Sequence, residues 1–394
     1  MSADPLQLVS EMHGSPTMLV FEFAGAGSLA LHWLHAVGGS SRTVLEAVDR
    51  YAAASLAAAI GELPDQVVTP EVAAGLARHA RERARALAPP GVAVIGVGCT
   101  ATIATDRVKR GEHRACIAVE GTLGRHALRL ALRKGQRERD EEERLVSTLV
   151  LHATATGCGV LHRRALTLGD GETLQESFTP AAPLAELLAG ERREVVLTPE
   201  GELRERLPWP SGGIAIVSGS FNPLHQGHLG LASAAQSHLG RPAAFELSTH
   251  NAEKPVIEPA ELYRRATQFQ GRAPLLLTGV ALFSHKAQRY PGSVFVLGAD
   301  TAARVLSPRY YPADHDLDVS LQLVRQHGCS FLVAGRRTSV PGTRGEEERF
   351  VTLADLDVPE RYVDLFEALP EDAFRADVSS SAIRERWNDS GAQR

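Results

Sequence analysis

The sequence predicts an α/β protein with two domains, of which the second is a doubly wound parallel sheet. From residue 212 onward, short β-branched runs alternate with helical stretches, a pattern typical of parallel strands joined by crossover helices. A chain of 394 residues is also long enough for two separate cores. We therefore predict an N-terminal α/β domain over 1–165, a linker over 166–211 and the parallel-sheet domain over 212–394.

The composition is ordinary for a globular protein, with 44% hydrophobic and 23% charged residues. A net charge of −5 argues against a nucleic-acid partner bound through a broad basic face. The four cysteines do not stand at metal-ligand spacing, so we expect no zinc site and a reducing compartment. No signal peptide opens the sequence, and no apolar run reaches the roughly 20 residues of a membrane span. We therefore expect a cytoplasmic protein without membrane contact.

In the first domain, Ala-rich helical stretches alternate with short apolar runs. Helices are predicted over 46–61, 70–91 and 139–157, and strands over 91–98 and 113–121. The helix at 70–91 opens with Pro70 and closes at the Pro89–Pro90 pair. Turn formers and prolines then predict the linker, with a short strand near 193–201.

In the second domain, one strand runs directly into the stretch "SFNPLHQGH". Strands are predicted over 213–219, 242–248, 273–279, 293–300 and 329–336, with helices over 228–240 and 259–271. Ligands bind at the carboxyl ends of such strands, which is where Ser220, Phe221, His225 and His228 fall. Two imidazoles beside the N-terminus of a helix predict a phosphate site. The alternative is a turn with two incidental surface histidines.

Two motifs carry a resemblance to a known family. "GSFNPLHQGH" at 219–228 resembles the G-x-F-x-P-x-H-x-G-H signature of the HxGH-motif nucleotidyltransferase superfamily. "DVSSSAIRER" at 377–386 is similar to the I-S-S-[ST]-x-I-R element of the same enzymes. From the residues alone, the serines can cap a helix and Arg384 can clamp phosphate oxygens, or they form an ordinary cap with a surface arginine. The resemblance covers roughly 212–390 and implies a Rossmann-like fold.

The resemblance implies transfer of a nucleotidyl group from a nucleoside triphosphate to a phosphate-bearing acceptor, with Mg²⁺ bridging phosphate oxygens. It implies catalytic roles for His225, His228, Lys254 and Arg384. The implied ATP-binding residues are Ser218, Gly219, Ser220, Phe221, His225, His228, Gly298, Asp300, Ser379, Ser380, Ser381 and Arg384. The implied acceptor-binding residues are Asn251, Asp300, Thr301 and Arg336.

Three strings indicate a subtype: "SSSAIR", "GADT" at 298–301 and "ELSTHNAEKP" at 246–255. They are most similar to nicotinamide or nicotinate mononucleotide adenylyltransferases, which implies transfer of AMP from ATP to a pyridine mononucleotide in NAD biosynthesis or salvage. Two alternatives stay open. The acceptor is pantetheine phosphate or a small alcohol phosphate, or the protein is a catalytically silent nucleotide-binding regulator.

The first domain resembles the C-terminal domain of CinA proteins over about 15–160. The stretches "GGSSRTVLEAVDRY" and "GVGCTATIATDRVKRGEHRACIAVEG" carry this resemblance. Some CinA domains deamidate nicotinamide mononucleotide with a serine nucleophile, but here Phe23 and Gly25 stand at the serine and threonine positions. Tyr51 is off register, and no lysine accompanies it. We expect no deamidase activity, although Ser28 is an alternative nucleophile, and we expect a homo-oligomer formed through this domain.

A basic cluster in the first domain has two interpretations. It consists of Arg107, Lys109, Arg110, His113 and Arg114. These residues form either a phosphate-binding loop for a mononucleotide or a solvated loop between two strands.

Overall fold

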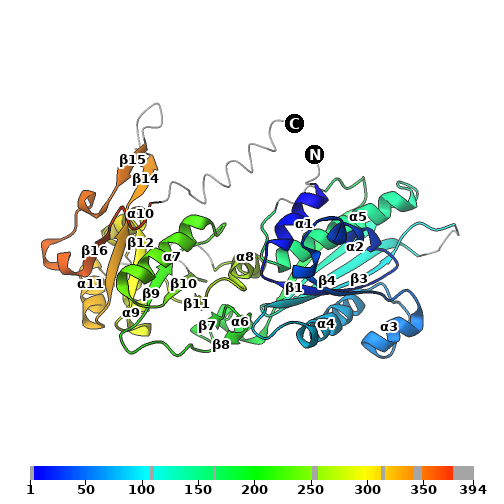
Figure 1. Cartoon of the computed structure of the whole chain (residues 1–394), viewed down its shortest axis with the longest axis horizontal. Helices are drawn as coiled ribbons and strands as arrows, with labels where there is room; N and C mark the ends of the chain where they lie inside the picture. Colours follow the sequence, from blue (N-terminus) through cyan, green and yellow to red (C-terminus); the bar gives the residue numbers. More distant parts are fainter. Residues whose placement is uncertain are drawn as a thin grey trace. The chain divides into compact units, whose positions relative to one another are not determined.

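The computed structural model describes residues 4–106, 111–162, 166–250, 256–311, 316–339 and 348–375 (Figure 1). Contacts divide the chain into two units, and neither is a continuous stretch. Unit 1 comprises Met1–Ala185, Leu197–Leu203 and Glu258–Arg272, and unit 2 comprises Glu186–Val196, Arg204–Ile257 and Ala273–Arg394. Each unit contains a sheet with helices on both faces. None of the described helices is long and apolar enough to cross a membrane.

Unit 1 contains a mixed sheet of six strands in the order β2-β1-β3-β4-β5-β6. The strands are β1 (Met18–Ala24), β2 (Val44–Asp49), β3 (Val94–Thr102), β4 (His113–Gly121), β5 (Gly124–Leu132) and β6 (Thr173–Pro180). β1 pairs in parallel with β2 and β3, and β3, β4, β5 and β6 pair antiparallel. The predicted α/β class of this part is therefore confirmed.

Helices cover both faces of the unit 1 sheet (Figure 1). α4 (Pro70–Leu87) lies on one face with α3 (Ala53–Ile60) against it, and α1 (Pro5–His13), α2 (Ser28–Ala36) and α5 (Arg139–Gly157) lie on the other. A Cβ at Gly96 or Gly98 would lie 2.1 Å or 2.3 Å from a backbone oxygen of α4. The glycines of β3 thus let α4 approach the sheet closely.

The helix predicted over 46–61 is wrong in its first part. Val44–Asp49 forms β2, whose residues pair with β1 up to Phe23 opposite Asp49, and α3 begins only at Ala53. Hydrogen bonding to β1 at the sheet edge overrides the local helical preference of the sequence. The helices predicted over 70–91 and 139–157 are confirmed as α4 and α5, and the strands over 91–98 and 113–121 as β3 and β4.

Unit 2 contains a sheet in the order β16-β13-β12-β9-β10-β11-β7-β8. Its parallel strands are β9 (Ala215–Ser218), β10 (Ala243–Ser248), β11 (Leu275–Thr278), β12 (Val294–Gly298), β13 (Ser330–Ala334) and β16 (Phe366–Leu369). From β9 the chain builds outward through β10 and β11 on one side, and then through β12, β13 and β16 on the other. The predicted doubly wound parallel sheet is thus confirmed.

The helices of unit 2 lie on both faces of this sheet. α7 (Gln226–Leu239) packs on β9 and β10. Ile216, Phe295 and Phe331 belong to the core that also contains α9 (Phe283–Arg289), α10 (Ala299–Val305) and α11 (Leu317–Gln326). A short antiparallel pair, β14 (Arg336–Ser339) and β15 (Glu348–Val351), follows β13.

Two segments differ from the predicted division of the chain. Residues 166–211, predicted as a linker, contain β6, α6 (Ala182–Leu188), β7 (Glu194–Leu197) and β8 (Leu203–Arg204). β6 extends the sheet of unit 1 and β7 that of unit 2. The helix α8 (Pro259–Ala266), which connects β10 to β11 in sequence, belongs to unit 1.

Candidate nucleotide-binding site

The histidine motif lies at the switch point of the unit 2 sheet. In a doubly wound sheet, a crevice opens at the carboxyl ends of the two strands where the chain order reverses. Here these strands are β9 and β12, which pair directly. β9 ends at Ser218 and leads into the motif, and β12 ends at Gly298 and leads into α10. Predicted site residues from both strands therefore meet at one edge.

Gly219 and Phe221 shape the turn after β9. Gly219 N–H donates to the carbonyl oxygen of Glu246 in β10 at 3.1 Å. Phe221 has a φ of +45°, which is unusual for a residue with a side chain, and its ring is buried. A Cβ at Gly219 would lie 2.8 Å from this ring. The turn therefore requires glycine beside the ring of Phe221.

His225 and His228 stack on each other at the start of α7. His225 is the N-cap residue, and His228 lies in the first turn. Their ring centroids are 3.8 Å apart, and His225 N–H donates to His228 Nδ1 at 3.3 Å. The Phe221 ring meets His228 edge-on, with centroids 5.1 Å apart. Because Nδ1 of His228 accepts, the neutral ring carries its proton on Nε2, which can donate to a ligand.

Both histidine rings are neutral near pH 7. Burial lowers the pKa of His228 to about 3, and the charges of His225 and Arg336 add to this effect. Burial, followed by the charge of Arg336, also lowers the pKa of His225. The pair can therefore bind phosphate oxygens as hydrogen-bond donors without carrying charge of its own.

Two buried polar atoms at this edge lack a hydrogen-bond partner among the described residues. They are Ser218 Oγ and His225 Nδ1. A buried polar atom without a partner costs about 1–3 kcal/mol, so such atoms are rare in folded proteins. Both atoms can therefore form hydrogen bonds with a ligand that reaches this edge of the sheet.

Asp300 and Arg336 come from the next two strands of the sheet. Asp300 lies in the first turn of α10, after β12, and Arg336 begins β14, after β13. Arg336 Nη1 lies 3.3 Å from Asp300 Oδ2, and both side chains are partly exposed. The positive charge of Arg336 lowers the pKa values of both histidines, because it disfavours a second positive charge nearby. Gly298 caps α10, and Thr301 lies in the same turn as Asp300.

The structure thus brings together the described members of the predicted ATP and acceptor sites. Ser220 lies exposed in the turn between Gly219 and Phe221. The other predicted residues, namely Asn251, Lys254, Ser379, Ser380, Ser381 and Arg384, lie outside the described residues. Their roles stay predictions.

A buried ion pair beside this edge was missed by the sequence analysis. Glu246, near the end of β10, accepts from Lys286 Nζ at 2.7 Å and from Thr278 Oγ1 at 2.6 Å. Both charged side chains are almost fully buried. Since the Glu246 carbonyl also accepts from Gly219, the pair fixes β10 beside the motif turn. The signal in the sequence was a glutamate within the apolar strand "FELS", because a buried charge needs a partner.

Comparison with known families assigns the second half of the chain. Residues 216–386 match the family model described as cytidylyltransferase-like. This part of the chain is a cytidylyltransferase-like domain. The match spans the histidine pair, Asp300 and Arg336, so the site described above lies within it. The prediction of a nucleotidyltransferase enzyme is confirmed.

Structures similar to the part before the cytidylyltransferase-like domain come from the CinA superfamily. Competence/damage-inducible protein CihA from Agrobacterium tumefaciens is 17% identical over 39% of this chain and 93% of its own, with a TM-score of 0.30. A CinA superfamily protein from Enterobacter cloacae is 9% identical over 40% of this chain and 94% of its own, with a TM-score of 0.33. A competence or damage-inducible protein from Enterobacter asburiae is 10% identical over 39% and 96%, with a TM-score of 0.32. A comparison with curated proteins found no match.

In unit 1, the carboxylate of Glu143 occupies the N-terminus of α2. Its Oε1 accepts from Gly27 N–H (3.0 Å), Leu29 N–H (3.2 Å), Ser28 Oγ (3.0 Å) and Ser147 Oγ (3.0 Å). Amides at a helix N-terminus favour an anion, and here the chain supplies that anion itself. Phe23, which the sequence resemblance predicts at the position of the CinA serine, is buried, and Tyr51 is 74% exposed.

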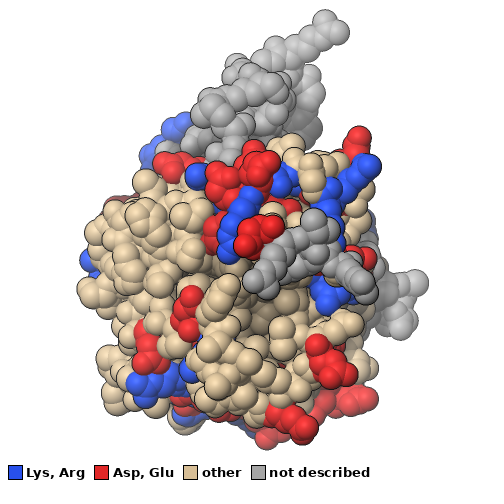
Figure 2. All heavy atoms as spheres, turned by 90° about the vertical axis from the view of Figure 1, so that its right-hand side faces the viewer, with Lys and Arg blue, Asp and Glu red and all other residues tan. Residues whose placement is uncertain are grey.

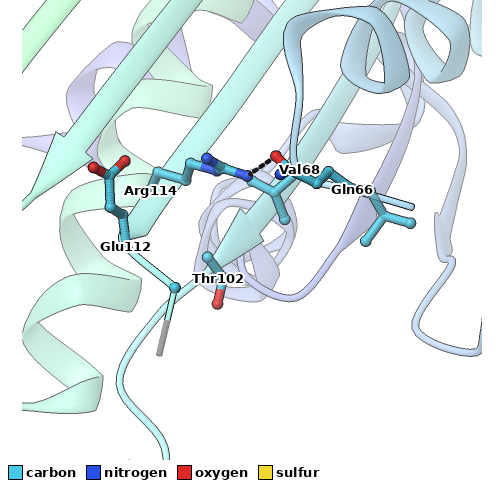
Figure 3. A pocket seen from close by; sticks show the side chains of 7 residues that line it. Gln66, Val68, Thr102, Glu112 and Arg114 are labelled. Carbon is cyan, nitrogen blue, oxygen red and sulfur yellow. Dashed lines mark hydrogen bonds between the residues drawn. The ribbon is translucent and has the colours of Figure 1, made fainter. Parts of the chain in front are cut away.

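A surface cavity of about 560 Å³ lies at the ends of β3 and β4 (Figure 3). It is lined by Gln66, Val67, Val68, Thr102, Gly111, Glu112 and Arg114. Arg114 Nη2 donates to Gln66 Oε1 at 3.0 Å, so a member of the predicted basic cluster reaches this cavity. His113 instead pairs with the buried carboxylate of Glu142 at 2.9 Å. Arg107, Lys109 and Arg110 lie outside the described residues.

One face of the molecule is shown in Figure 2. Lys and Arg side chains lie among Asp and Glu side chains there, and much of the surface is uncharged. Among the described residues visible on this face, neither sign of charge forms a continuous patch.

Proposed function

We propose that the protein transfers AMP from ATP to nicotinamide or nicotinate mononucleotide and releases pyrophosphate, as a step of NAD biosynthesis or salvage. The observation that carries the proposal is the neutral histidine pair at the switch point of a nucleotidyltransferase domain. Two buried polar atoms beside it have no partner among the residues that the structure describes. The choice of a pyridine acceptor rests on the sequence resemblance of 246–255, 298–301 and 379–384 to mononucleotide adenylyltransferases.

The proposed reaction needs no nucleophilic side chain. A phosphate oxygen of the acceptor forms a bond to the α-phosphorus of ATP while the bond from that phosphorus to pyrophosphate breaks in line. The site contributes by positioning both substrates and stabilising charge on the phosphate oxygens. His228 donates through Nε2–H to these oxygens, and Ser218 Oγ and His225 Nδ1 gain their missing partners when ATP binds.

We assign the leaving pyrophosphate to Lys254 and Arg384, and further ATP contacts to Ser379, Ser380 and Ser381, from the family motifs. Mg²⁺ enters with ATP, and when bound it offsets negative charge on the phosphates. Asp300 is partly exposed and already paired with Arg336, which fits an ion held mainly by the triphosphate.

The acceptor is assigned to Asn251, Asp300, Thr301 and Arg336. Arg336 presents a planar fork of donors that suits the acceptor phosphate, and its pair with Asp300 orients that fork. The polar side chains of Asp300 and Thr301 are left to bind sugar or pyridine substituents.

An acceptor screen that measures pyrophosphate release tests this function. Release from ATP with a pyridine mononucleotide is the expected result. Release only with pantetheine phosphate or a small alcohol phosphate would identify another acceptor, and ATP binding without release would identify a regulator. His228→Ala should lower kcat by about 10²–10³-fold, with an unchanged circular dichroism spectrum. His238→Ala, on the same helix and paired with exposed Glu367, is the control.

For unit 1 we propose a CinA-like fold without deamidase activity that joins copies of the chain into a homo-oligomer. The carboxylate at the N-terminus of α2 and the buried Phe23 support the lack of hydrolysis. Release of ammonia from nicotinamide mononucleotide would contradict it. Sedimentation of the full chain tests the oligomer. A cytoplasmic location stays a prediction from the sequence.

A further inference from the structure

The segment between β10 and β11 packs into unit 1. It comprises Glu258–Arg272 and contains α8 and the 3-10 helix η2 (Thr267–Phe269). In a doubly wound fold, a crossover helix normally covers the strands that it connects. Here α8 lies against β6 of unit 1, although the segment falls inside the 216–386 family match. Part of the nucleotidyltransferase sequence is therefore held by the other unit.

Tyr263 is the residue that anchors this segment. Its side chain is 2% exposed, and its ring centroid lies 4.5 Å from that of Phe178 in β6 and 5.7 Å from that of His126 in β5. His126 is itself held by Glu176 at 2.6 Å. A buried tyrosine removes a large apolar surface from water, so it contributes strongly to the attachment of α8.

Glycines in unit 1 make room for the segment. A Cβ at Gly159 would lie 2.4 Å from the carbonyl oxygen of Thr267, so this position requires glycine beside the segment. At the far end, a Cβ at Gly271 would lie 2.4 Å from Pro16, and Gly271 N–H donates to the Pro199 carbonyl at 2.8 Å. This close approach over the whole segment indicates a specific fit rather than a loose contact.

The near end of the segment joins the carboxyl end of β10. Thr249 follows β10, is buried, and is fixed to β11 by its N–H, which donates to the Thr278 carbonyl at 2.8 Å. Ile257 N–H donates to the Thr249 carbonyl at 3.0 Å. Ile257 immediately precedes Glu258, the N-cap of α8. The anchored helix is thus one residue away from a hydrogen bond at the edge where ATP is proposed to bind.

We propose that unit 1 positions the nucleotidyltransferase site by holding this crossover segment, with Tyr263 as the positioning residue. The inference rests on the proposed nucleotidyl transfer and gives unit 1 a task that needs no chemistry of its own. Loosening α8 removes a restraint on Ile257 and therefore on Thr249. The carboxyl end of β10 then becomes more mobile beside β9, and ATP binding weakens.

The test compares three variants of the full chain: Tyr263→Ala, Tyr263→Phe and Leu56→Ala. The Tyr263 hydroxyl has no hydrogen-bond partner among the described residues, so Tyr263→Phe keeps the anchor. Leu56→Ala is the matched control, because Leu56 is buried in unit 1 against Val72 and Leu76 and away from the segment. If Tyr263→Ala does not fold, Tyr263→Leu replaces it. Hydrogen exchange of peptides spanning Thr249 and Ile257, and the kinetics of pyrophosphate release, are measured for each.

In Tyr263→Ala, we expect exchange at Thr249 and Ile257 to accelerate at least about tenfold. The KM for ATP should rise about tenfold while kcat changes less than about threefold. Tyr263→Phe and Leu56→Ala should both keep the exchange rate at Thr249 and Ile257 and the KM for ATP at their wild-type values. Unchanged exchange in Tyr263→Ala, or equal acceleration in Leu56→Ala, would overturn the inference. If the wild type releases no pyrophosphate with any acceptor, the proposed function fails and the exchange result alone decides the inference.

Discussion

Protonation of His228 should make the stability of unit 2 depend on pH in a calculable way. The pKa of His228 is about 3 in the folded protein and 6.5 as its ordinary value. Below pH 6.5 the His228 ring of the unfolded chain is protonated, whereas the ring in the folded protein stays neutral down to about pH 3. The contribution of neutral His228 to the free energy of unfolding is complete above pH 6.5. It falls by about 1.4 kcal/mol for each unit by which the pH decreases below that value. Between pH 6.5 and 5 the loss is about 2 kcal/mol.

Urea unfolding at pH 7 and pH 5, followed by far-UV circular dichroism, measures this loss. His228→Gln removes the titrating ring. From pH 7 to pH 5, the free energy of unfolding of this variant should therefore decrease by about 2 kcal/mol less than that of the wild type. His238→Gln is the control and should keep the wild-type dependence within about 0.5 kcal/mol. If the units unfold in separate transitions, the difference between the wild type and His228→Gln should be confined to the transition of unit 2. An equal loss in the wild type and His228→Gln would refute the reasoning.

Three further predictions concern stability and are measured by urea unfolding. Lys286→Met leaves the buried Glu246 carboxylate unpaired and should cost about 3–5 kcal/mol, most of which Glu246→Gln restores in the double variant; no recovery would contradict the charge argument. Gly98→Ala places a Cβ 2.3 Å from a backbone oxygen of α4 and should cost at least about 1–3 kcal/mol, whereas Gly38→Ala, with open space around it, should stay within about 0.5 kcal/mol. Glu143→Ala removes the acceptor at the start of α2 and should cost about 1–2 kcal/mol, part of which added formate restores; insensitivity to formate would argue against an anion position.

The arrangement of the candidate site could be predicted in part, because its described residues are close in sequence or follow adjacent strands. His225 and His228 are three residues apart at the start of a helix, so their position on one side could be predicted from the spacing, whereas the stacking of their rings is seen only in the structure. Asp300 and Arg336 follow neighbouring parallel strands, whose carboxyl ends meet at one edge. The position of Glu246 within an apolar strand indicates a buried charge, but nothing in the local sequence identifies Lys286 as its partner.

The elements that the sequence analysis missed depend on tertiary partners. β2 is partly exposed along most of its length, so it lacks the apolar run that marks a buried strand. β6 likewise alternates between exposed and partly buried residues, and its place is fixed by pairing with β5. The helix at 259–271 was predicted, but nothing in its own pattern tells which sheet it covers. The sheet against which this helix packs is decided by its contacts with Phe178 and His126 and by the glycines of unit 1.

Because Glu258–Arg272 packs in unit 1, the order in which the ribosome makes the two partners of this contact matters. The apolar surface around Phe178 is complete once β6 has been made, but its cover emerges only after β9, α7 and β10. At about 5–20 residues per second, this surface stays open for roughly 5–20 s in each nascent chain. Exposed apolar surface of this kind favours aggregation with neighbouring chains. Substitutions that slow docking of α8 should therefore lower the yield of soluble protein even where the finished fold is unaffected.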